Sequence, residues 1–320
     1  MKYKRKILIT GGAGFIGSAL VEKFIENPEN FVVIVDNLST GNIKNLSHLP
    51  KNNWHFIKCN VNSYRDIAEV MQSFNFDYVF HYAAVVGVQR TQEKPIEVLM
   101  DLQGLGYILN LCKNSGIKRV FFSSSSEVYG TPIEFPQNEN TTPLNSRIPY
   151  AIVKNAGEVF LKSFKKEYNL DYTIFRFFNT YGPKQSNDFV ISRFIALALK
   201  NQNITIYGDG LQTRTFCYID DNIDACLNAF YNDIFVNDII NIGNDNEITI
   251  LDLAKKIINI TNSKSKIIHL PPLKEGDMKR RLPDITKTKY LLNRKLVTLD
   301  QGIKNIIDSP EFIKFFPVNN

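Results

Sequence analysis

Cysteine is scarce in this sequence, and long hydrophobic runs are missing from it. The 320 residues include four cysteines, with no CxxC pair and no nearby histidines at zinc-ligand spacing: Cys59, Cys112, Cys217 and Cys226. We therefore expect buried, reduced thiols in a cytoplasmic protein without a metal site. No apolar run is as long as a membrane span, and the N-terminus has no signal-peptide pattern, so we expect no membrane partner.

Charge of one sign is not concentrated anywhere along the chain. Lysine and arginine number 38 against 32 acidic residues, which gives a net charge of +6, and no basic stripe carries interleaved aromatics. We therefore expect no nucleic-acid partner, whereas the mild basic excess suits a small anionic ligand. The 44% hydrophobic and 22% charged content is ordinary for a globular protein with a large core.

Short β-rich runs alternate with helical patterns through the first half of the chain. The expected strands are 6–10, 31–36, 54–59, 77–84 and the run KRVFFSSSS, and the expected helices are 15–26, 64–74 and 95–116. This alternation predicts an α/β fold, a Rossmann-like doubly wound parallel sheet. After about residue 180, turn-rich loops and short helices replace the alternation, with a late strand at 238–243. We expect a smaller α/β C-terminal region there.

A glycine-rich turn joins the first expected strand to the first helix. The run ITGGAGFIG places Gly11, Gly14 and Gly17 three residues apart, where glycine lets the backbone approach a pyrophosphate at the helix N-terminus. Asp36 ends the second strand at the spacing of a residue that binds adenosine ribose hydroxyls, and its charge favours NAD over NADP. The alternatives are a plain tight corner for the glycines and a strand-end cap for Asp36.

Two further patterns indicate redox chemistry next to the dinucleotide. Tyr150 and Lys154 lie four residues apart on an expected helix, and therefore on one face. A lysine beside a tyrosine lowers the phenol pKa, so that the phenolate takes a proton while hydride passes to NAD; simple packing is the alternative. The run SSSSEVYG, at 123–130, follows a buried strand, where ligands bind in such sheets. We interpret it as a substrate shelf and not as a linker.

The ordered motifs of the chain resemble those of the extended short-chain dehydrogenase/reductase family, in particular the NAD-dependent nucleotide-sugar epimerases, dehydratases and decarboxylases. The resemblance runs almost end to end, through TGGAGFIGS, VDNLSTG, HYAA, SSSSEVYG, PYAIVK, RFFNTYGPKQ, YGDGLQTRTFCYIDD, NIGNDNEITILDLAKKI and GDMKRRLPD. It implies an NAD-binding Rossmann domain over 1–180, joined by the strand near 238–243, and a mainly nucleotide-sugar-binding region over 181–320.

Carried over position by position, the resemblance implies roles for single residues. The implied catalytic residues are Tyr150, Lys154, Glu127 and Ser125, the last of which binds the sugar C4 hydroxyl. Besides Tyr150 and Lys154, the implied NAD contacts are Gly11, Gly14, Phe15, Ile16, Gly17, Asp36, Asn37, Asn60, Val61, Ala83 and Ala84. The implied substrate contacts are Ser125 and Ser126, with Asn179, Arg214 and Arg280 at the nucleotide diphosphate. Asn60 departs from the acid usual in the family, and a surface ion pair is the alternative for each arginine.

The motifs leave the reaction open among relatives that all oxidise the sugar at C4. Glu127 resembles the glutamate of dehydratases and glucuronate decarboxylases, where a carboxylate acts as a base beside the ketone; a structural role is the alternative. Ser126 replaces the aspartate of dTDP-glucose dehydratases, whereas HYAAVVGVQRT looks more like an epimerase segment. We expect a Glu127-assisted 4,6-dehydratase or UDP-glucuronate decarboxylase. The alternatives are a UDP-sugar 4-epimerase and, more remotely, a non-catalytic NAD-binding sensor.

The resemblance also implies the partners of the protein. The substrate is a nucleotide sugar, with UDP as the expected nucleotide, used in making polysaccharide or glycan precursors. A homodimer is expected through the helices that carry PYAIVK and DLQGLGYILNLC, whose apolar faces suit a four-helix interface; cover within one chain is the alternative.

Overall fold

The computed structural model describes residues 3–50, 52–272 and 278–315. The chain divides into two compact units. Unit 1 comprises 1–130, 144–176 and 226–240, and unit 2 comprises 131–143, 177–225 and 241–320. The chain therefore passes into unit 2 twice, first for residues 131–143 and then after Arg176. It returns to unit 1 for residues 226–240. The cofactor and substrate roles expected for the two parts of the chain stay predictions.

The elements that belong wholly or mainly to unit 1 alternate between strand and helix. They are β1 (Arg5–Thr10), α1 (Phe15–Ile25), β2 (Asn30–Asp36), the 3-10 helix η1 (Ile43–Asn45), β3 (Trp54–Lys58), α2 (Tyr64–Ser73), β4 (Tyr78–His81), α3 (Val88–Glu93), α4 (Pro95–Cys112), β5 (Arg119–Ser125), the 3-10 helix η2 (Ser126–Tyr129), α5 (Pro149–Tyr168), β6 (Asp171–Phe177) and β11 (Asp238–Ile242). The helix α7 (Ile219–Tyr231) crosses the boundary between the units.

One seven-stranded sheet has the order β11-β6-β5-β4-β1-β2-β3. The neighbouring strands from β3 to β5 all pair in parallel, with Leu8 opposite Val33 and Val79 opposite Val120. The strand order reverses at β1, so the chain winds outward in both directions from the first strand. This confirms the Rossmann-like doubly wound sheet that the alternation predicts.

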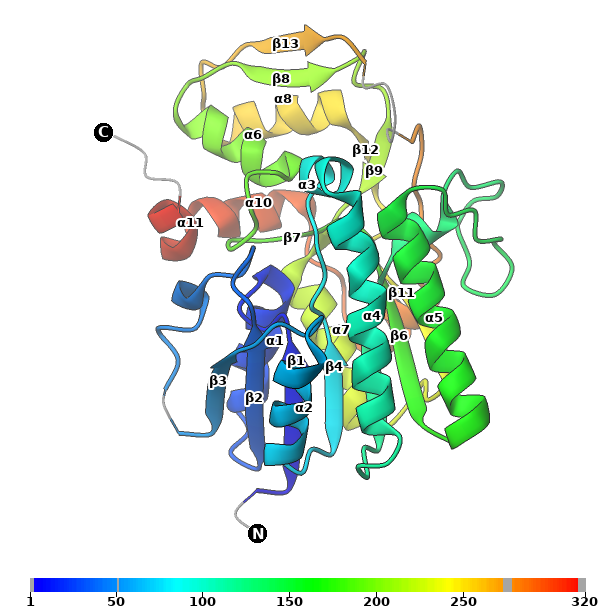
Figure 1. The fold of residues 1–320 in the computed structure, drawn as a ribbon. Helices are drawn as coiled ribbons and strands as arrows, with labels where there is room; N and C mark the ends of the chain where they lie inside the picture. The colour runs from blue at the N-terminus through cyan, green and yellow to red at the C-terminus, as the bar shows by residue number, and fades with distance from the viewer. Residues whose placement is uncertain (1–2, 51, 273–277, 316–320) are drawn as a thin grey trace. The chain divides into compact units, whose positions relative to one another are not determined.

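Helices cover both faces of this sheet, which is why its strands are apolar on both sides. On one face the strand residues Leu8, Val33, Val79 and Val120 pack into one buried cluster with side chains of α2, α4 and α5. On the other face Phe80 and Phe121 stack with ring centroids 4.3 Å apart, and Phe24 of α1 and Phe230 of α7 meet them edge-on. Figure 1 shows α4 and α5 side by side in front of the sheet.

Unit 2 is built from short strand pairs and helices. Its further elements are β7 (Thr180–Tyr181), α6 (Val190–Leu199), β8 (Ile204–Tyr207), β9 (Thr213–Thr215), β10 (Cys217–Tyr218), β12 (Glu247–Thr249), α8 (Ile250–Ile260), β13 (Ile267–Leu270), α9 (Thr286–Leu292), α10 (Leu299–Ile307) and α11 (Pro310–Phe315). The pairs β7–β10 and β8–β13 are parallel, and the pair β9–β12 is antiparallel.

The expected elements match the observed ones, except at some ends. The expected strand 77–84 stops at His81, because the backbone N–H groups of Tyr82 and Ala83 turn to the Thr10 side chain. The expected helix 95–116 stops at Cys112. Within the described residues, no helix combines the length and the apolar content that crossing a membrane would require.

Candidate active site

The glycine turn between β1 and α1 is shaped by close backbone contacts. Gly11 has a φ of +69°, and a Cβ there would lie 2.7 Å from the backbone nitrogen of Ala83, so only glycine fits. Gly14 is the N-cap of α1, and a Cβ on it would have only Gly11 O, at 3.1 Å, among its neighbours. The space beyond Gly14 is therefore open at a helix N-terminus without an acidic first turn, which is a cradle for an anion.

Asp36 links the end of β2 to this turn. Its Oδ2 accepts the Ala13 N–H at 3.1 Å and its Oδ1 accepts the Leu38 N–H at 2.8 Å. Burial raises the pKa of this carboxyl, and the two backbone donors oppose that rise. Each carboxylate oxygen keeps a second acceptor position, so the group still fits ribose hydroxyls. The strand-end cap and the ribose role are thus compatible.

The other cofactor candidates lie around the same strand ends. Phe15 and Ile16 begin α1, and Asn37 follows Asp36 at the end of β2. Asn60 and Val61 follow β3, where the Asn60 Oδ1 accepts the Asn62 N–H at 3.1 Å. Ala83 and Ala84 follow β4. All of these segments lie at the carboxyl ends of β1 to β4, as the cofactor site of such a sheet requires.

Thr10, which sequence reasoning missed, organises the segment after β4. Its Oγ1 accepts the N–H groups of Tyr82 and Ala83, both at 3.1 Å, and lies 2.9 Å from His81 Nδ1. Because two donors fill its lone pairs, the Thr10 hydroxyl donates its proton to His81 Nδ1. Burial, helped by the charge of Lys154, lowers the pKa of His81 to about 3, so the imidazole is neutral. The signal for Thr10 is its position directly before the glycine turn.

Tyr150 and Lys154 lie on the first turns of α5, on one face as their spacing predicts. Lys154 is 3% exposed, and its Nζ donates to Ser123 Oγ at 3.4 Å and lies 5.8 Å from the Tyr150 ring centroid. Burial is the main effect on this ammonium and lowers its pKa to about 8, against the opposing charge of Asp101. A lysine in this state changes charge close to neutral pH.

The four serines at the end of β5 are all buried, and Ser123, Ser124 and Ser125 each form a different hydrogen bond. Ser123 binds Lys154 and also donates to the His81 carbonyl at 3.3 Å. Ser124 Oγ donates to Glu158 Oε1 at 2.5 Å. Ser125 is the N-cap of η2, with its Oγ accepting the Glu127 N–H at 3.2 Å, and Ser126 is 2% exposed. The run is therefore part of the folded sheet edge, and Ser125 and the half-buried Glu127 share one turn.

A buried ionic network behind that turn was also missed by sequence reasoning. Arg176 of β6 donates to both carboxylate oxygens of Glu158, from Nε at 2.9 Å and from Nη2 at 2.6 Å. Its Nη1 donates to the Tyr129 hydroxyl at 2.8 Å. These contacts tie η2, α5 and β6 together. The sequence holds one weak signal for this network, because Glu158 follows Lys154 by one helical turn and therefore lies on the same face of the helix.

The remaining substrate candidates, Asn179, Arg214 and Arg280, lie in unit 2. Asn179 Nδ2 donates to the Thr215 carbonyl at 2.9 Å, and Arg214 Nη1 donates to the Thr213 carbonyl at 2.8 Å. Arg280 forms a two-fold ion pair with Glu247 of β12, at 2.9 and 2.7 Å. Because β12 pairs with β9, both arginines are anchored on the same two strands. Arg280 is thus ion-paired in this structure, and its expected substrate role stays a prediction.

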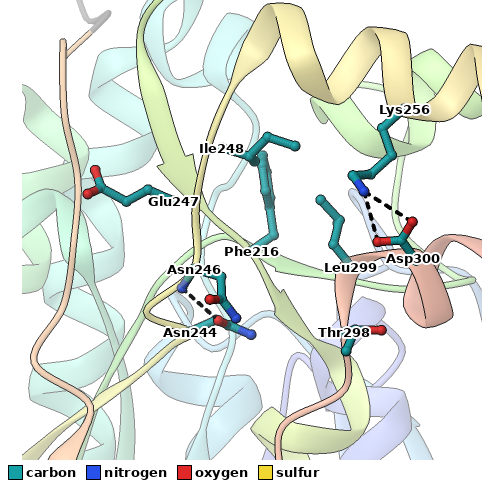
Figure 2. A pocket seen from close by; sticks show the side chains of 9 residues that line it. All are labelled: Phe216, Asn244, Asn246, Glu247, Ile248, Lys256, Thr298, Leu299 and Asp300. Carbon is teal, nitrogen blue, oxygen red and sulfur yellow. Dashed lines mark hydrogen bonds and ion pairs between the residues drawn. The ribbon is translucent and has the colours of Figure 1, made fainter.

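Unit 2 also has a cavity of about 250 Å³ that sequence reasoning did not anticipate. Figure 2 shows Phe216 beside Ile248, and Lys256 paired with Asp300 at 2.9 Å. The other lining residues are Asn244, Asn246, Glu247, Thr298 and Leu299. None of the expected site residues lines it. Among the described residues, no three histidine, cysteine or acidic side chains converge as a metal site requires.

Comparisons with known proteins show which proteins the chain is similar to. The model of the NAD dependent epimerase/dehydratase family matches residues 7–243. The chain is 37% identical over 319 residues to a UDP-N-acetyl-α-D-glucosaminuronate decarboxylase of Bacillus cytotoxicus, covering 95% of this chain and 97% of the other. It is 35% identical to UDP-glucuronic acid decarboxylase 4 of Arabidopsis thaliana, over 94% and 68% of the two chains. A Thermotoga maritima UDP-glucose 4-epimerase structure with UDP-glucose matches at 33% identity and TM-score 0.89, over 97% and 99%.

Proposed function

Since this chain belongs to the NAD-dependent epimerase/dehydratase family, we propose that it removes the carboxylate of a UDP-hexuronic acid after transient oxidation at the sugar C4. When bound, NAD supplies the chemistry of accepting a hydride from C4 and returning it. The open cradle at Gly14 and the acceptor positions left on Asp36 fit this cofactor. The protein is an NAD-dependent enzyme, and the choice of reaction is the proposal.

The oxidation step is assigned to the residues around Lys154. We assign Tyr150 as the base that takes the proton from the C4 hydroxyl as the C4–H bond breaks and the ketone forms. The charge of Lys154, next to the tyrosine ring, favours the phenolate. Ser125, at the end of β5, is proposed to hold the C4 oxygen. The buried network of Glu158 and Arg176 keeps this turn and α5 in fixed register.

The position of Glu127 is the observation on which the choice of reaction rests. Its backbone N–H donates to Ser125 Oγ, so Glu127 stands in the same turn as the residue that is proposed to bind the C4 oxygen. A 4-ketone makes the neighbouring carboxylate a β-keto acid: the C5–C6 bond breaks, carbon dioxide leaves, and its electron pair forms an enolate between C5 and C4. We propose that Glu127 transfers the proton that C5 then needs. Epimerisation at C4 needs no such group.

The nucleotide is proposed to bind through unit 2. Arg214 lies on β9, and Arg280 is held by its ion pair with Glu247 on the paired strand β12, so the two guanidinium groups suit a diphosphate. Asn179, with its left-handed backbone at φ +37°, supplies a further amide. The exposed Glu247–Arg280 pair is weak enough to exchange for a phosphate oxygen.

A Glu127→Gln variant tests the assignment. We expect it to form NADH with UDP-glucuronate or its N-acetyl analogue but to release pentose product at least tenfold more slowly. Glu69→Gln, at an exposed carboxylate of α2, is the matched control and should behave as wild type. A Glu127→Gln enzyme with undiminished product release would remove Glu127 from the mechanism.

A UDP-sugar 4-epimerase is the second candidate, favoured by the high structural likeness to the Thermotoga maritima enzyme. It predicts a product of unchanged mass and a different retention time. Incubation with UDP-glucose, UDP-N-acetylglucosamine and UDP-glucuronate, followed by chromatography and mass spectrometry, separates the two candidates.

We also propose a homodimer, formed by α4 and α5. Five apolar residues on these helices expose between 43% and 70% of their surface: Ile96, Leu99, Met100, Ile152 and Val159. Such a row suits a second copy of the same pair of helices. Val159→Glu should produce a monomer in light scattering, whereas Ile133→Glu, at a more exposed residue of unit 2, should not. The four buried, unbridged cysteines support a proposed cytoplasmic location.

A further inference from the structure

Asp101, on α4, connects two separate segments at the carboxyl ends of the strands. Its Oδ2 accepts the Val85 N–H at 2.6 Å, and its Oδ1 accepts from the Asn62 side-chain amide at 3.0 Å. Val85 follows Ala84 in the segment after β4, and Asn62 follows Val61 in the turn after β3. Both segments contain cofactor candidates, and neither contacts the other through the sheet. One carboxylate therefore sets the spacing between them.

The helix surface beside Asp101 is adapted to the Asn62 side chain. A Cβ on Gly104, less than one turn further along α4, would lie 2.1 Å from Asn62 Oδ1. The Asn62 backbone N–H in turn donates to Asn60 Oδ1 at 3.1 Å. A chain of contacts thus runs from α4 through Asn62 to Asn60, which is one of the expected NAD contacts.

Asp101 also acts on Lys154 by charge. The Lys154 ammonium contacts Ser123 and Phe122 of β5 and lies near the ring of Tyr150 of α5, whereas His81 of β4 and Asp101 of α4 are coupled to it by charge. His81 is neutral, and the next acid along α5, Glu158, is neutralised by Arg176. Asp101 is the carboxylate that raises the pKa of Lys154 against the effect of burial. Burial raises the pKa of Asp101 itself, and the hydrogen bonds from Asn62 and Val85 and the charge of Lys154 oppose that rise.

We propose that Asp101 is a positioning residue with two tasks, which are to hold the segments after β3 and β4 at the spacing that NAD binding requires and to keep Lys154 cationic during oxidation of the sugar. The first task rests only on the NAD dependence of the enzyme. The second rests on the proposed role of Lys154 but not on which reaction follows the oxidation.

Two substitutions separate the tasks. An amide in Asp101→Asn still accepts from Val85, and its NH₂ group reaches Asn62 once the Asn62 amide turns over, so the spacing survives while the charge is lost. Asp101→Leu loses both the spacing and the charge. Glu97→Gln, at an exposed carboxylate near the start of the same helix, is the matched control because Glu97 pairs with Lys94 on the surface.

The first measurement is the NAD retained by purified protein after gel filtration, together with the NAD dissociation constant. We expect Asp101→Leu to bind NAD at least tenfold more weakly, and Asp101→Asn and Glu97→Gln to stay within about twofold of wild type. This readout needs no substrate, so it stands even if the proposed reaction is wrong. Wild-type NAD affinity in Asp101→Leu would overturn the holding task.

The second measurement is the pH dependence of NADH formed in the first turnover, with any nucleotide sugar that the wild type oxidises. Loss of the Asp101 charge should move the alkaline decline to lower pH in Asp101→Asn, because Lys154 then loses its proton more readily. Glu97→Gln should leave the profile in place. An unmoved profile in Asp101→Asn would overturn the charge task. If Asp101→Leu fails to fold, Asp101→Ala takes its place in the measurement of NAD binding. The measurement of pH dependence needs only Asp101→Asn.

Discussion

Glu158 and Arg176 form a two-fold ion pair in the interior of unit 1, with N···O distances of 2.9 and 2.6 Å and side chains only 1% and 2% exposed. The pair joins α5 to β6, and Ser124 and Tyr129 satisfy further positions on the two groups. Both charges are therefore compensated, which is the condition under which a buried pair is tolerated. The pair lies directly behind the turn that carries Ser125 and Glu127.

Breaking this pair should destabilise the protein strongly. Glu158→Gln leaves the Arg176 guanidinium buried without a counter-charge, and we expect a loss of about 3–5 kcal/mol in the free energy of unfolding. Urea denaturation followed by circular dichroism measures it. The double variant Glu158→Leu, Arg176→Met should lose less than the sum of the two single variants, because no uncompensated charge remains. A single variant as stable as wild type would contradict this account of the core.

The oxidation step should depend on pH through Lys154. Burial brings its pKa to about 8, so the ammonium is present below that value and is lost above it. The first-turnover rate of NADH formation should therefore fall as the pH rises through about 8. In Lys154→Arg the guanidinium stays charged, so the alkaline decline should vanish even where the rate is lower. A wild-type rate that keeps rising above this pKa would show that the cation is not required.

Local patterns predicted well those parts of the fold and site that lie within a few residues of one another. The glycine turn and the pair Tyr150 and Lys154 are of this kind, because one strand-to-helix turn or one helical turn sets their geometry. The doubly wound sheet was predictable for a similar reason, since alternating strands and helices allow few topologies.

Contacts between distant strands could not be predicted in the same way. Thr10 meets His81 only because β1 and β4 are neighbours in register, and Glu158 meets Arg176 only because β6 packs against α5. The predicted end of β4, at residue 84, lies three residues beyond its observed end at His81, because the contacts of Thr10 with the segment after β4 could not be predicted. Asp101 was not predicted, because the helix that carries it was interpreted from its apolar residues as part of a dimer interface. The spacing of residues along the chain does not tell which strands become neighbours or how they are aligned.

The glycine turn provides a test with an internal control. Gly11→Ala would place a Cβ 2.7 Å from Ala83 N at a positive φ, so we expect loss of NAD retention and a clear loss of stability. Gly106→Ala on α4 meets nothing within 4 Å and should stabilise the protein by about 0.5–1 kcal/mol. Thermal unfolding with and without NAD reports both effects. A Gly11→Ala protein that binds NAD normally would contradict the described turn.

The measurement that tests the proposed reaction most directly is the release of labelled carbon dioxide from UDP-glucuronic acid, or its N-acetyl analogue, carrying an isotope in the C6 carboxylate. The account predicts that the wild-type protein releases the label in step with formation of a UDP-pentose product. It also predicts that Glu127→Gln still forms NADH and releases the label of a first turnover but forms the UDP-pentose far more slowly, because C5 of the enolate lacks its proton donor. Full retention of the label in a UDP-sugar isomer of unchanged mass would contradict decarboxylation and assign the enzyme to the 4-epimerases.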